Sequence, residues 1–223
     1  MEIPGKILTT QSMLNAVPLL GREFHIDRGN GFIMVYPFRC RVSIYEPIPE
    51  AEGKKNLKRL NEYFSMLMRY GTPNPSGKGS VSQQKKIMIE KECVESDLTG
   101  LASAAMYHGL GKKQHTRVQD HLHSSCPFTI ASEIPVWSVI EDFKDGLGGE
   151  SLLHGHIDLI RYMPNGRVQV LDFKPGASKE TKAASQVWRY MWLLSLRTGI
   201  SMGDIDGFYF DDEVCYKIIS QVT

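Results

Sequence analysis

The chain has 223 residues, of which 42% are hydrophobic and 23% charged, and its formal net charge is +1. These values are ordinary for a globular protein that forms one large domain or a core domain with an extension. A net charge near zero provides no general basic field, so nucleic-acid binding would require local clusters of lysine and arginine. No apolar run approaches the ~20 residues of a membrane span, and no secretory signal is visible, so we expect no membrane partner.

Four cysteines, at positions 40, 93, 126 and 215, are widely separated along the chain. No CxxC pair occurs, which argues against a zinc ribbon, and so few cysteines in a chain of this length argue against a disulfide scaffold. We therefore expect free, mostly buried thiols and a cytoplasmic, reducing location.

Residues 1–98 are expected to form a strand-rich N-terminal extension with one helix and a linker. Leucine and other apolar residues recur at helical spacing from residue 54 to 69. A segment rich in Pro, Gly, Ser and Asn at about 71–86 is typical of a linker. Apolar, β-branched or aromatic runs predict short strands at 32–36, 42–45 and 87–89.

Residues 99–223 are expected to form the main α/β domain. A helical pattern at 103–122 is interrupted by glycines at 109 and 111, which indicates two helices, with His121 and His123 at a solvated end. A second helix is expected at 179–197, ended by Gly199. Strands are expected at 128–140, 157–163, 168–173, 205–210 and 214–219. This order predicts a central mixed sheet flanked by helices.

The most informative pair of segments lies in the hairpin predicted around residues 155–174. Its strands carry Asp158 and Asp172, and Lys174 projects to the same face as Asp172 because alternate residues of a strand share a face. The alternative is a surface salt-bridge cluster. The apolar residues on both sides indicate buried strands, where unpaired acids are costly, so we favour a site. Two acids and a lysine can hold a divalent metal and activate a water against a phosphodiester.

Five short motifs occur in a fixed order on these elements: G-x-x-x-H at 111–115, S-E-I-P at 132–135, G-x-x-D at 155–158, D-x-K-x-G at 172–176 and Q-x-x-x-Y at 186–190. Each motif alone is weak, but their joint order is specific. Together they resemble the PD-(D/E)XK nuclease superfamily, and within it the RecB-type branch that includes CRISPR-associated nucleases and mitochondrial DNA exonucleases. The resemblance covers about residues 101–219 and leaves residues 1–98 unexplained.

The resemblance implies a restriction-endonuclease-like core that cleaves DNA with Mg²⁺ or Mn²⁺. The implied catalytic residues are Asp158, Asp172, Lys174 and Glu133. The implied metal ligands are His115, Asp158, Asp172 and the backbone carbonyl of Phe173. Gln186 and Tyr190 would contact DNA or position the lysine. Beside His115, the cations Lys112, Lys113 and Arg117 could line a track for DNA phosphates.

Several alternatives remain open at the level of sequence. The resemblance favours an exonuclease, or an enzyme acting on flaps or single strands, in DNA repair, recombination or processing. A structure-specific or sequence-specific endonuclease and a non-catalytic DNA-binding module are the rivals.

His154, His156 and Asp158 alternate along one strand and could bind zinc by themselves. Related nucleases often carry an iron–sulfur cluster with three cysteines after the core. Only Cys215 lies there, which argues against a cluster. Residues 1–98 could guide DNA, form a homo-oligomer or dock a protein partner.

Overall fold

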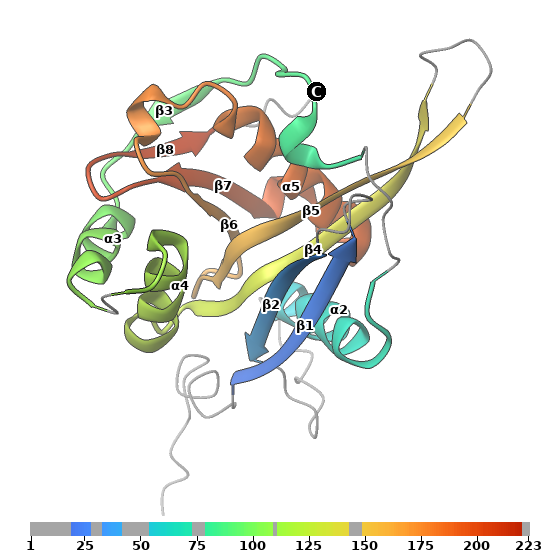
Figure 1. Cartoon of the computed structure of the whole chain (residues 1–223), viewed down its shortest axis with the longest axis horizontal. Coiled ribbons are helices and arrows are strands. Elements are labelled where there is room, and N and C mark those ends of the chain that lie inside the picture. Colours follow the sequence, from blue (N-terminus) through green and yellow to red (C-terminus); the bar gives the residue numbers. More distant parts are fainter. Residues whose placement is uncertain are drawn as a thin grey trace, which may run out of the picture.

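The structure is a computed structural model that describes residues 19–27, 33–41, 54–72, 79–108, 111–142 and 149–219 (Figure 1). The strands are β1 (Leu19–Asp27), β2 (Ile33–Arg41), β3 (Lys91–Cys93), β4 (Thr129–Asp142), β5 (Gly149–Tyr162), β6 (Val168–Phe173), β7 (Ile205–Phe210) and β8 (Cys215–Ile218). The helices are α2 (Lys55–Tyr70), α3 (Asp97–Tyr107), α4 (Gln114–Ser125) and α5 (Ala183–Thr198). Three short 3₁₀ turns are η1 (Val81–Gln83), η2 (Ala177–Lys179) and η3 (Met202–Asp204).

The described strands form one eight-stranded sheet in the order β1-β2-β4-β5-β6-β7-β8-β3. Strands β6 and β7 pair in parallel, and the other neighbouring pairs of the sheet are antiparallel. The protein is therefore an α/β protein with a mixed sheet flanked by helices, as the sequence predicted. The two strands that carry the paired acids, β5 and β6, lie in the middle of this sheet.

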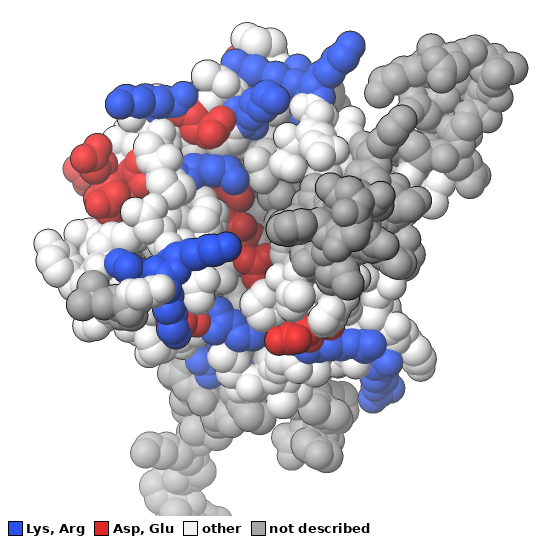
Figure 2. All heavy atoms as spheres, in the orientation of Figure 1, with Lys and Arg blue, Asp and Glu red and all other residues white. Residues whose placement is uncertain are grey.

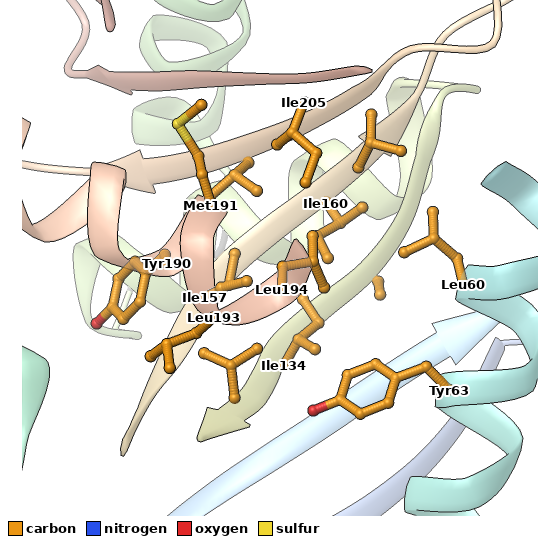
Figure 3. Close-up of a cluster of buried hydrophobic side chains, with 14 of the residues drawn as sticks. Leu60, Tyr63, Ile134, Ile157, Ile160, Tyr190, Met191, Leu193, Leu194 and Ile205 are labelled. Atoms are coloured by element: carbon orange, nitrogen blue, oxygen red, sulfur yellow. The ribbon is translucent and has the colours of Figure 1, made fainter. Parts of the chain in front are cut away.

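Helices cover both faces of the sheet and create two buried cores. On one face, α2 and α5 pack against apolar side chains of β4 to β7, several of which are drawn in Figure 3. On the other face, α3 and α4 bury a smaller cluster that includes Leu122, Leu171 and Phe173. The end of β6 thus lies between helices that approach from opposite sides.

Helix α5 lies very close to the sheet because β7 carries a glycine beneath it. A Cβ atom at Gly207 would come within 2.4 Å of the Met191 sulfur and 2.7 Å of a Val187 methyl group. On its inner face α5 buries residues spaced three or four apart: Ala183, Val187, Tyr190, Met191 and Leu194. Gly199, in the left-handed conformation with φ 69°, ends the helix as expected.

The N-terminal region extends the same sheet at both edges. Strands β1 and β2 form a hairpin, and β2 joins β4 through the pairs Arg39–Ser132 and Cys40–Ala131. Strand β3 pairs with β8 at the opposite edge. Residues 79–90 precede β3 in the chain. Within this segment, Gly79 lies so close to β5 that an added Cβ would meet the Leu152 carbonyl. The three described strands within the first 98 residues are therefore part of the central sheet.

Five predicted elements have both ends within two residues of their predicted bounds: the helix at 54–69 and the strands at 128–140, 168–173, 205–210 and 214–219. By contrast, β5 begins at Gly149 instead of 157, α3 begins at Asp97 instead of 103, and β2 ends at Arg41 instead of 36. The helix at 54–69, the long strand at 128–140, the division of 103–122 into α3 and α4, and both C-terminal hairpins are confirmed. The helix expected from residue 179 begins at Ala183, because η2 follows the left-handed Gly176. The expected strand at 42–45 lies outside the described residues.

Two strand assignments in the first half differ from the sequence prediction. Residues 87–89 are not a strand; the edge strand is β3 at 91–93, where the backbone can pair with β8. Strand β1 (LLGREFHID) mixes four apolar and three charged residues without regular alternation, so it had no recognisable strand pattern. Its pairing partner β2 stabilises it, which is a tertiary effect on a weak local preference.

All four cysteines are free, and they differ in solvent exposure. Cys40, Cys126 and Cys215 are buried, while Cys93 is exposed. Burial raises the pKa of Cys40 to about 12 and that of Cys215 to about 11, so both remain protonated thiols near neutral pH. No helix in the described part of the chain is long and apolar enough to cross a membrane.

Candidate active site

The two acids predicted from the β5–β6 hairpin lie side by side at the carboxyl end of β6. Leu159 pairs with Leu171, so the next position in the register places Asp158 beside Asp172. The backbone N–H of Phe173 donates a hydrogen bond of 2.9 Å to Oδ2 of Asp158. The same strand end continues to Lys174, whose N–H donates to the Phe210 carbonyl of β7. Pairing on both sides therefore fixes the backbone that carries the acids.

Asp172 is the most deeply buried acid of the site, with no exposed surface. Its Oδ2 atom lies 3.0 Å from Nζ of Lys174, and its Oδ1 atom has no hydrogen-bond partner among the described residues. Burial, together with the nearby charge of Asp158, raises the pKa of Asp172 to about 7, although Lys174 opposes this rise. A buried carboxylate oxygen without a partner is costly and is typical of a site that receives a ligand.

Asp158 is held ionised by the groups around it. Burial opposes its ionisation, but the hydrogen bond and charge of His115, the charge of Lys174 and the Phe173 N–H together lower its pKa. Nδ1 of His115 lies 3.3 Å from Oδ2 of Asp158, and this contact raises the pKa of the imidazole. The histidine ring also meets the Phe173 ring edge-on at 5.3 Å.

The structure brings His115 next to Asp158, but the local structure before His115 differs from expectation. Residues 111–113 are not helical; Gly111 has φ +95°, and α4 begins at Gln114. His115 is therefore in the first turn of α4, from which its side chain reaches across to the end of β6. A glycine at position 111 permits the sharp turn that leads into the helix.

Glu133 has a left-handed backbone with φ 53°, the single such non-glycine residue in the described part of the chain. Its neighbours Ser132 and Ile134 pair with Leu159 and Ile157, so Glu133 lies opposite Asp158 across the β4–β5 ladder. Burial and the charge of Asp158 raise its pKa to about 7. A strained backbone of this kind costs about 1–3 kcal/mol and is concentrated at functional sites.

Gln119, which sequence reasoning missed, holds Glu133 in place. It is 4% exposed, and its Nε2 atom donates a hydrogen bond of 2.6 Å to Oε1 of Glu133 and a longer one of 3.5 Å to the Asp158 carbonyl. Gln119 lies four residues after His115, so both side chains point from one face of α4. That spacing was a usable signal in the sequence.

Replacing Gln119 with leucine should lower Mn²⁺ affinity and cleavage by about 10–100-fold, since removing a partner that orients a metal-binding group has this effect. Calorimetric titration with Mn²⁺ and a cleavage assay would measure the two losses. Gln119→Glu is unsuitable because it adds charge; Gln114→Leu, on the exposed start of α4, is the matched control. Unchanged Mn²⁺ affinity in Gln119→Leu would contradict the assigned role.

Gln186 and Tyr190 of α5 approach the acids from the opposite face of the sheet. Nε2 of Gln186 donates a hydrogen bond of 2.9 Å to the Tyr190 hydroxyl. Tyr190 is 4% exposed, and burial together with the charges of Asp172 and Asp158 raises its pKa well above the ordinary value. The phenol is therefore a neutral hydrogen-bond donor beside the carboxylates.

Gly155, the glycine of the G-x-x-D motif, makes room for Tyr190. A Cβ atom at this position would lie 2.5 Å from Cε1 of Tyr190 and 3.3 Å from Val81.

Gly155→Ala should therefore displace the tyrosine, lower cleavage, and destabilise the protein by about 1–3 kcal/mol, as overpacking does. Urea unfolding would measure the change. Gly100→Ala, in an open position on α3, is the control; equal stability of the two variants would contradict this interpretation.

The three cations predicted to line a DNA track surround the start of α4. Lys112 forms an ion pair of 2.7 Å with Asp120, and Lys113 is exposed at the residue before the helix. Arg117 donates hydrogen bonds to the carbonyls of Lys112 (2.9 Å) and Met106 (3.3 Å). Figure 2 shows basic side chains over α4, beside a hollow in which acidic atoms are visible.

His123, expected at a solvated helix end, is instead buried at 6% exposure, with Nε2 2.9 Å from the Ser132 hydroxyl. Burial and the charges of Arg39 and Arg41 lower its pKa to about 3. The folded protein thus keeps the ring neutral while the unfolded chain protonates it below pH ~6.5.

Because the folded-state pKa of His123 is depressed, its contribution to stability is complete above pH ~6.5 and is lost as pH falls, by up to about 1.4 kcal/mol per pH unit. His123→Gln, which can still reach Ser132, should reduce this acid sensitivity. Urea unfolding of both proteins across the acidic range would measure the difference in slope. Parallel pH profiles for the two proteins would show that the histidine is not held neutral.

The donor set suits a hard divalent cation. Three carboxylates, an imidazole and a strand-end carbonyl are ligands that Mg²⁺ and Mn²⁺ accept, and the raised pKa values of Asp172 and Glu133 reveal excess negative charge at the site. Among the described residues, no group of three His, Cys, Asp or Glu side chains is close enough together to hold a metal ion in the present arrangement. The geometry does not favour the alternative zinc site at His154, His156 and Asp158, because the His156 ring stacks on Tyr36 with 3.7 Å between ring centroids.

No family model matches the chain, and no curated protein sequence matches it. Among solved structures, the crystal structure of a protein named SSO0001 is similar over 76% of this chain and 77% of that one, with 18% sequence identity and a TM-score of 0.38. A likeness at this level carries no argument about function. Function has to be inferred from the side chains of the site.

Proposed function

We propose that this protein is a metal-dependent DNA nuclease of the RecB type, with a restriction-endonuclease-like core. The observation that carries the proposal is Asp172, fully buried with one unpartnered oxygen and in contact with Lys174. Asp158 lies beside it on β5, and Glu133 lies opposite Asp158 on β4. A protein that used this region only for stability would not gain from three acids at one buried point.

Asp158, Asp172 and Glu133, with His115 and the carbonyl of Phe173, are the groups that would hold Mg²⁺ or Mn²⁺. When bound there, such an ion supplies a Lewis acid for the scissile phosphate and lowers the pKa of a bound water. This combination supports hydrolysis of phosphodiester bonds near neutral pH.

The protein's own residues supply the remaining parts of the mechanism. Lys174, protonated because Asp172 and Asp158 outweigh its burial, would stabilise negative charge that develops on the phosphate. His115 keeps Asp158 ionised, and Gln119 keeps Glu133 directed at Asp158. Tyr190, oriented by Gln186, places a neutral hydroxyl donor next to the acids.

The substrate preference that we propose is DNA ends, flaps or single strands, as in DNA repair, recombination or processing. It rests on the resemblance of the five motifs. A structure-specific or sequence-specific endonuclease is the second candidate, and the N-terminal strands that complete both sheet edges would then help to read the substrate. Free cysteines support a reducing cytoplasmic location.

The test is cleavage of end-labelled single-stranded, duplex and flapped DNA in the presence of Mg²⁺, Mn²⁺ or EDTA. Metal-dependent cleavage that Asp172→Asn abolishes would support the proposal, and the product ladder would separate exonuclease from endonuclease action. If no substrate is cleaved but DNA binding persists, the non-catalytic binding module becomes the better assignment.

A further inference from the structure

A second polar cavity, outside the catalytic centre, lies between the end of α3 and the outer side of α4. We call it the α3–α4 pocket. Its volume is about 330 Å³. It is lined by His108, Lys112, Arg117, His121, Ser124 and Ser125, together with Asp120. None of these side chains contacts the catalytic acids in the described structure, so the chemistry of the active site does not explain them.

The pocket is cationic because its one acid is already neutralised. Asp120 accepts from Lys112 at 2.7 Å and from Arg39 of β2 at 2.5 Å. Although burial opposes its ionisation, these two cations lower its pKa, so it stays charged and paired. Arg117 is left without an acidic partner in the described residues. Its Nε and Nη1 atoms are anchored on backbone carbonyls, which orients the guanidinium before any ligand arrives.

Two stacked histidines form one wall of the pocket. The rings of His108 and His121 are 5.2 Å apart and inclined by 11°. Burial and the neighbouring His108 lower the pKa of His121, since two parallel rings cannot both be protonated cheaply. An anion beside the pair would remove that penalty. Two imidazoles, a guanidinium and two serine hydroxyls are the donors that a phosphate accepts.

We propose that the α3–α4 pocket binds a phosphate group of the nucleic acid outside the catalytic centre. This inference rests on the proposed nuclease function and adds a second contact point to it. His115 and His121 are six residues apart on α4, or ~9 Å along its axis. The basic side chains over α4 lie on the same face as the acidic hollow in Figure 2. A strand that leaves the catalytic acids across α4 would bring a neighbouring phosphate over the pocket.

The first measurement is the binding of a fluorescent single-stranded oligonucleotide, detected by fluorescence anisotropy. EDTA is present so that no metal-dependent cleavage occurs. Arg117→Gln and His121→Asn should each weaken binding by roughly 3–10-fold, and Arg117→Gln should reduce the salt dependence by about 0.7 in log–log slope, the loss of one phosphate contact. Lys55→Gln, which removes an exposed charge on α2, is the control and should retain affinity and slope. Wild-type affinity for both variants, with the wild-type salt slope, would overturn the proposal.

Binding should also take up protons. Affinity of the wild type should rise as pH falls from about 8 to about 6. Protonation of Asp172 and Glu133, whose pKa values are about 7, contributes to that rise in both proteins, so His121→Asn should show a smaller increase than the wild type. The other groups that face His121 are His108, Lys112, Arg117 and Asp120. If the Arg117 variant fails to fold, the histidine signals of the wild type decide: the NMR titration of His121 should shift to higher pH with the oligonucleotide, and an unchanged titration would refute the inference.

Two further probes distinguish a terminal phosphate, a backbone phosphate and free inorganic phosphate as the group that the pocket binds. A preference for a 5′-phosphorylated oligonucleotide over its 5′-hydroxyl form that is lost in Arg117→Gln would assign a terminal phosphate. Equal binding of the two forms, still weakened by Arg117→Gln, would assign a backbone phosphate. Competition by inorganic phosphate alone, with no effect of Arg117→Gln on the oligonucleotide, would overturn the nucleic-acid assignment. Failure of the nuclease proposal is recognised separately, as absence of metal-dependent cleavage by the wild type.

Discussion

Asp172→Asn should reduce DNA cleavage by about 10³-fold or more, while the protein becomes more stable by roughly 2 kcal/mol near pH 8. The substitution keeps the shape of a fully buried side chain and removes its charge. The pKa of Asp172 is about 7 in the folded protein and about 4 in the unfolded chain. At pH values above about 4, ionisation of this residue therefore favours the unfolded chain. The gain in stability should therefore shrink as pH falls toward 4, where both states are protonated.

Urea unfolding at several pH values and a cleavage time course would measure both effects. Asp212→Asn, an exposed aspartate in the β7–β8 turn, is the matched control and should change neither activity nor stability by more than about 0.5 kcal/mol. A stable Asp172→Asn protein with wild-type cleavage would remove Asp172 from the catalytic set and, with it, the main support for the nuclease proposal.

Lys174→Met should lower cleavage by about 10²–10³-fold and, unlike Asp172→Asn, destabilise the protein by about 3 kcal/mol near pH 8. The side chain of Lys174 is largely buried, and its ammonium group is the partner of Asp172 at 3.0 Å. Removing it leaves an acid with no surface exposure and no cation in contact. Methionine retains the length and apolar volume of the lysine stem, so the loss reports mainly on charge.

The double variant Asp172→Asn/Lys174→Met separates the stability of the pair from its role in cleavage. In the Asp172→Asn background the lysine has no buried carboxylate to lose, so its replacement should no longer destabilise the protein. The double variant should lie within about 1 kcal/mol of Asp172→Asn, whereas its activity should stay as low as that of the single variants. A stability equal to the sum of the two single changes, about 1 kcal/mol below the wild type, would show that the two charges are not coupled in the folded protein. Lys179→Met, an exposed lysine on η2, is the control for the loss of a positive charge near the site.

The central part of the fold could be predicted because its local signals are strong. The apolar runs of β5 and β6 flank a short polar turn, and α5 repeats buried residues at helical spacing up to a terminal glycine. The edges of the sheet could not be predicted in the same way. Strand β3 has only three residues, all exposed, and exists through its pairing with β8.

The same division holds for the candidate site. Residues close together in sequence, such as Asp172 and Lys174, could be related by strand periodicity alone. Glu133 and His115 entered through the resemblance of the motifs, and the structure brings both near Asp158. Gln119 was missed because its spacing from His115 shows only that the two residues share a helix face, and not that the glutamine is buried against Glu133.

By itself, the sequence determined the α/β class, the hairpin with its two acids and lysine, and the order of the five motifs, since these depend on short-range periodicity. Only the tertiary structure decided which groups share a charge environment. The raised pKa values of Asp172 and Glu133, the left-handed backbone of Glu133, the neutral His123 and the stacked pair His108–His121 all arise from burial and from contacts between distant segments. Desolvation and charge proximity depend on the folded arrangement, and no local pattern of residues encodes them.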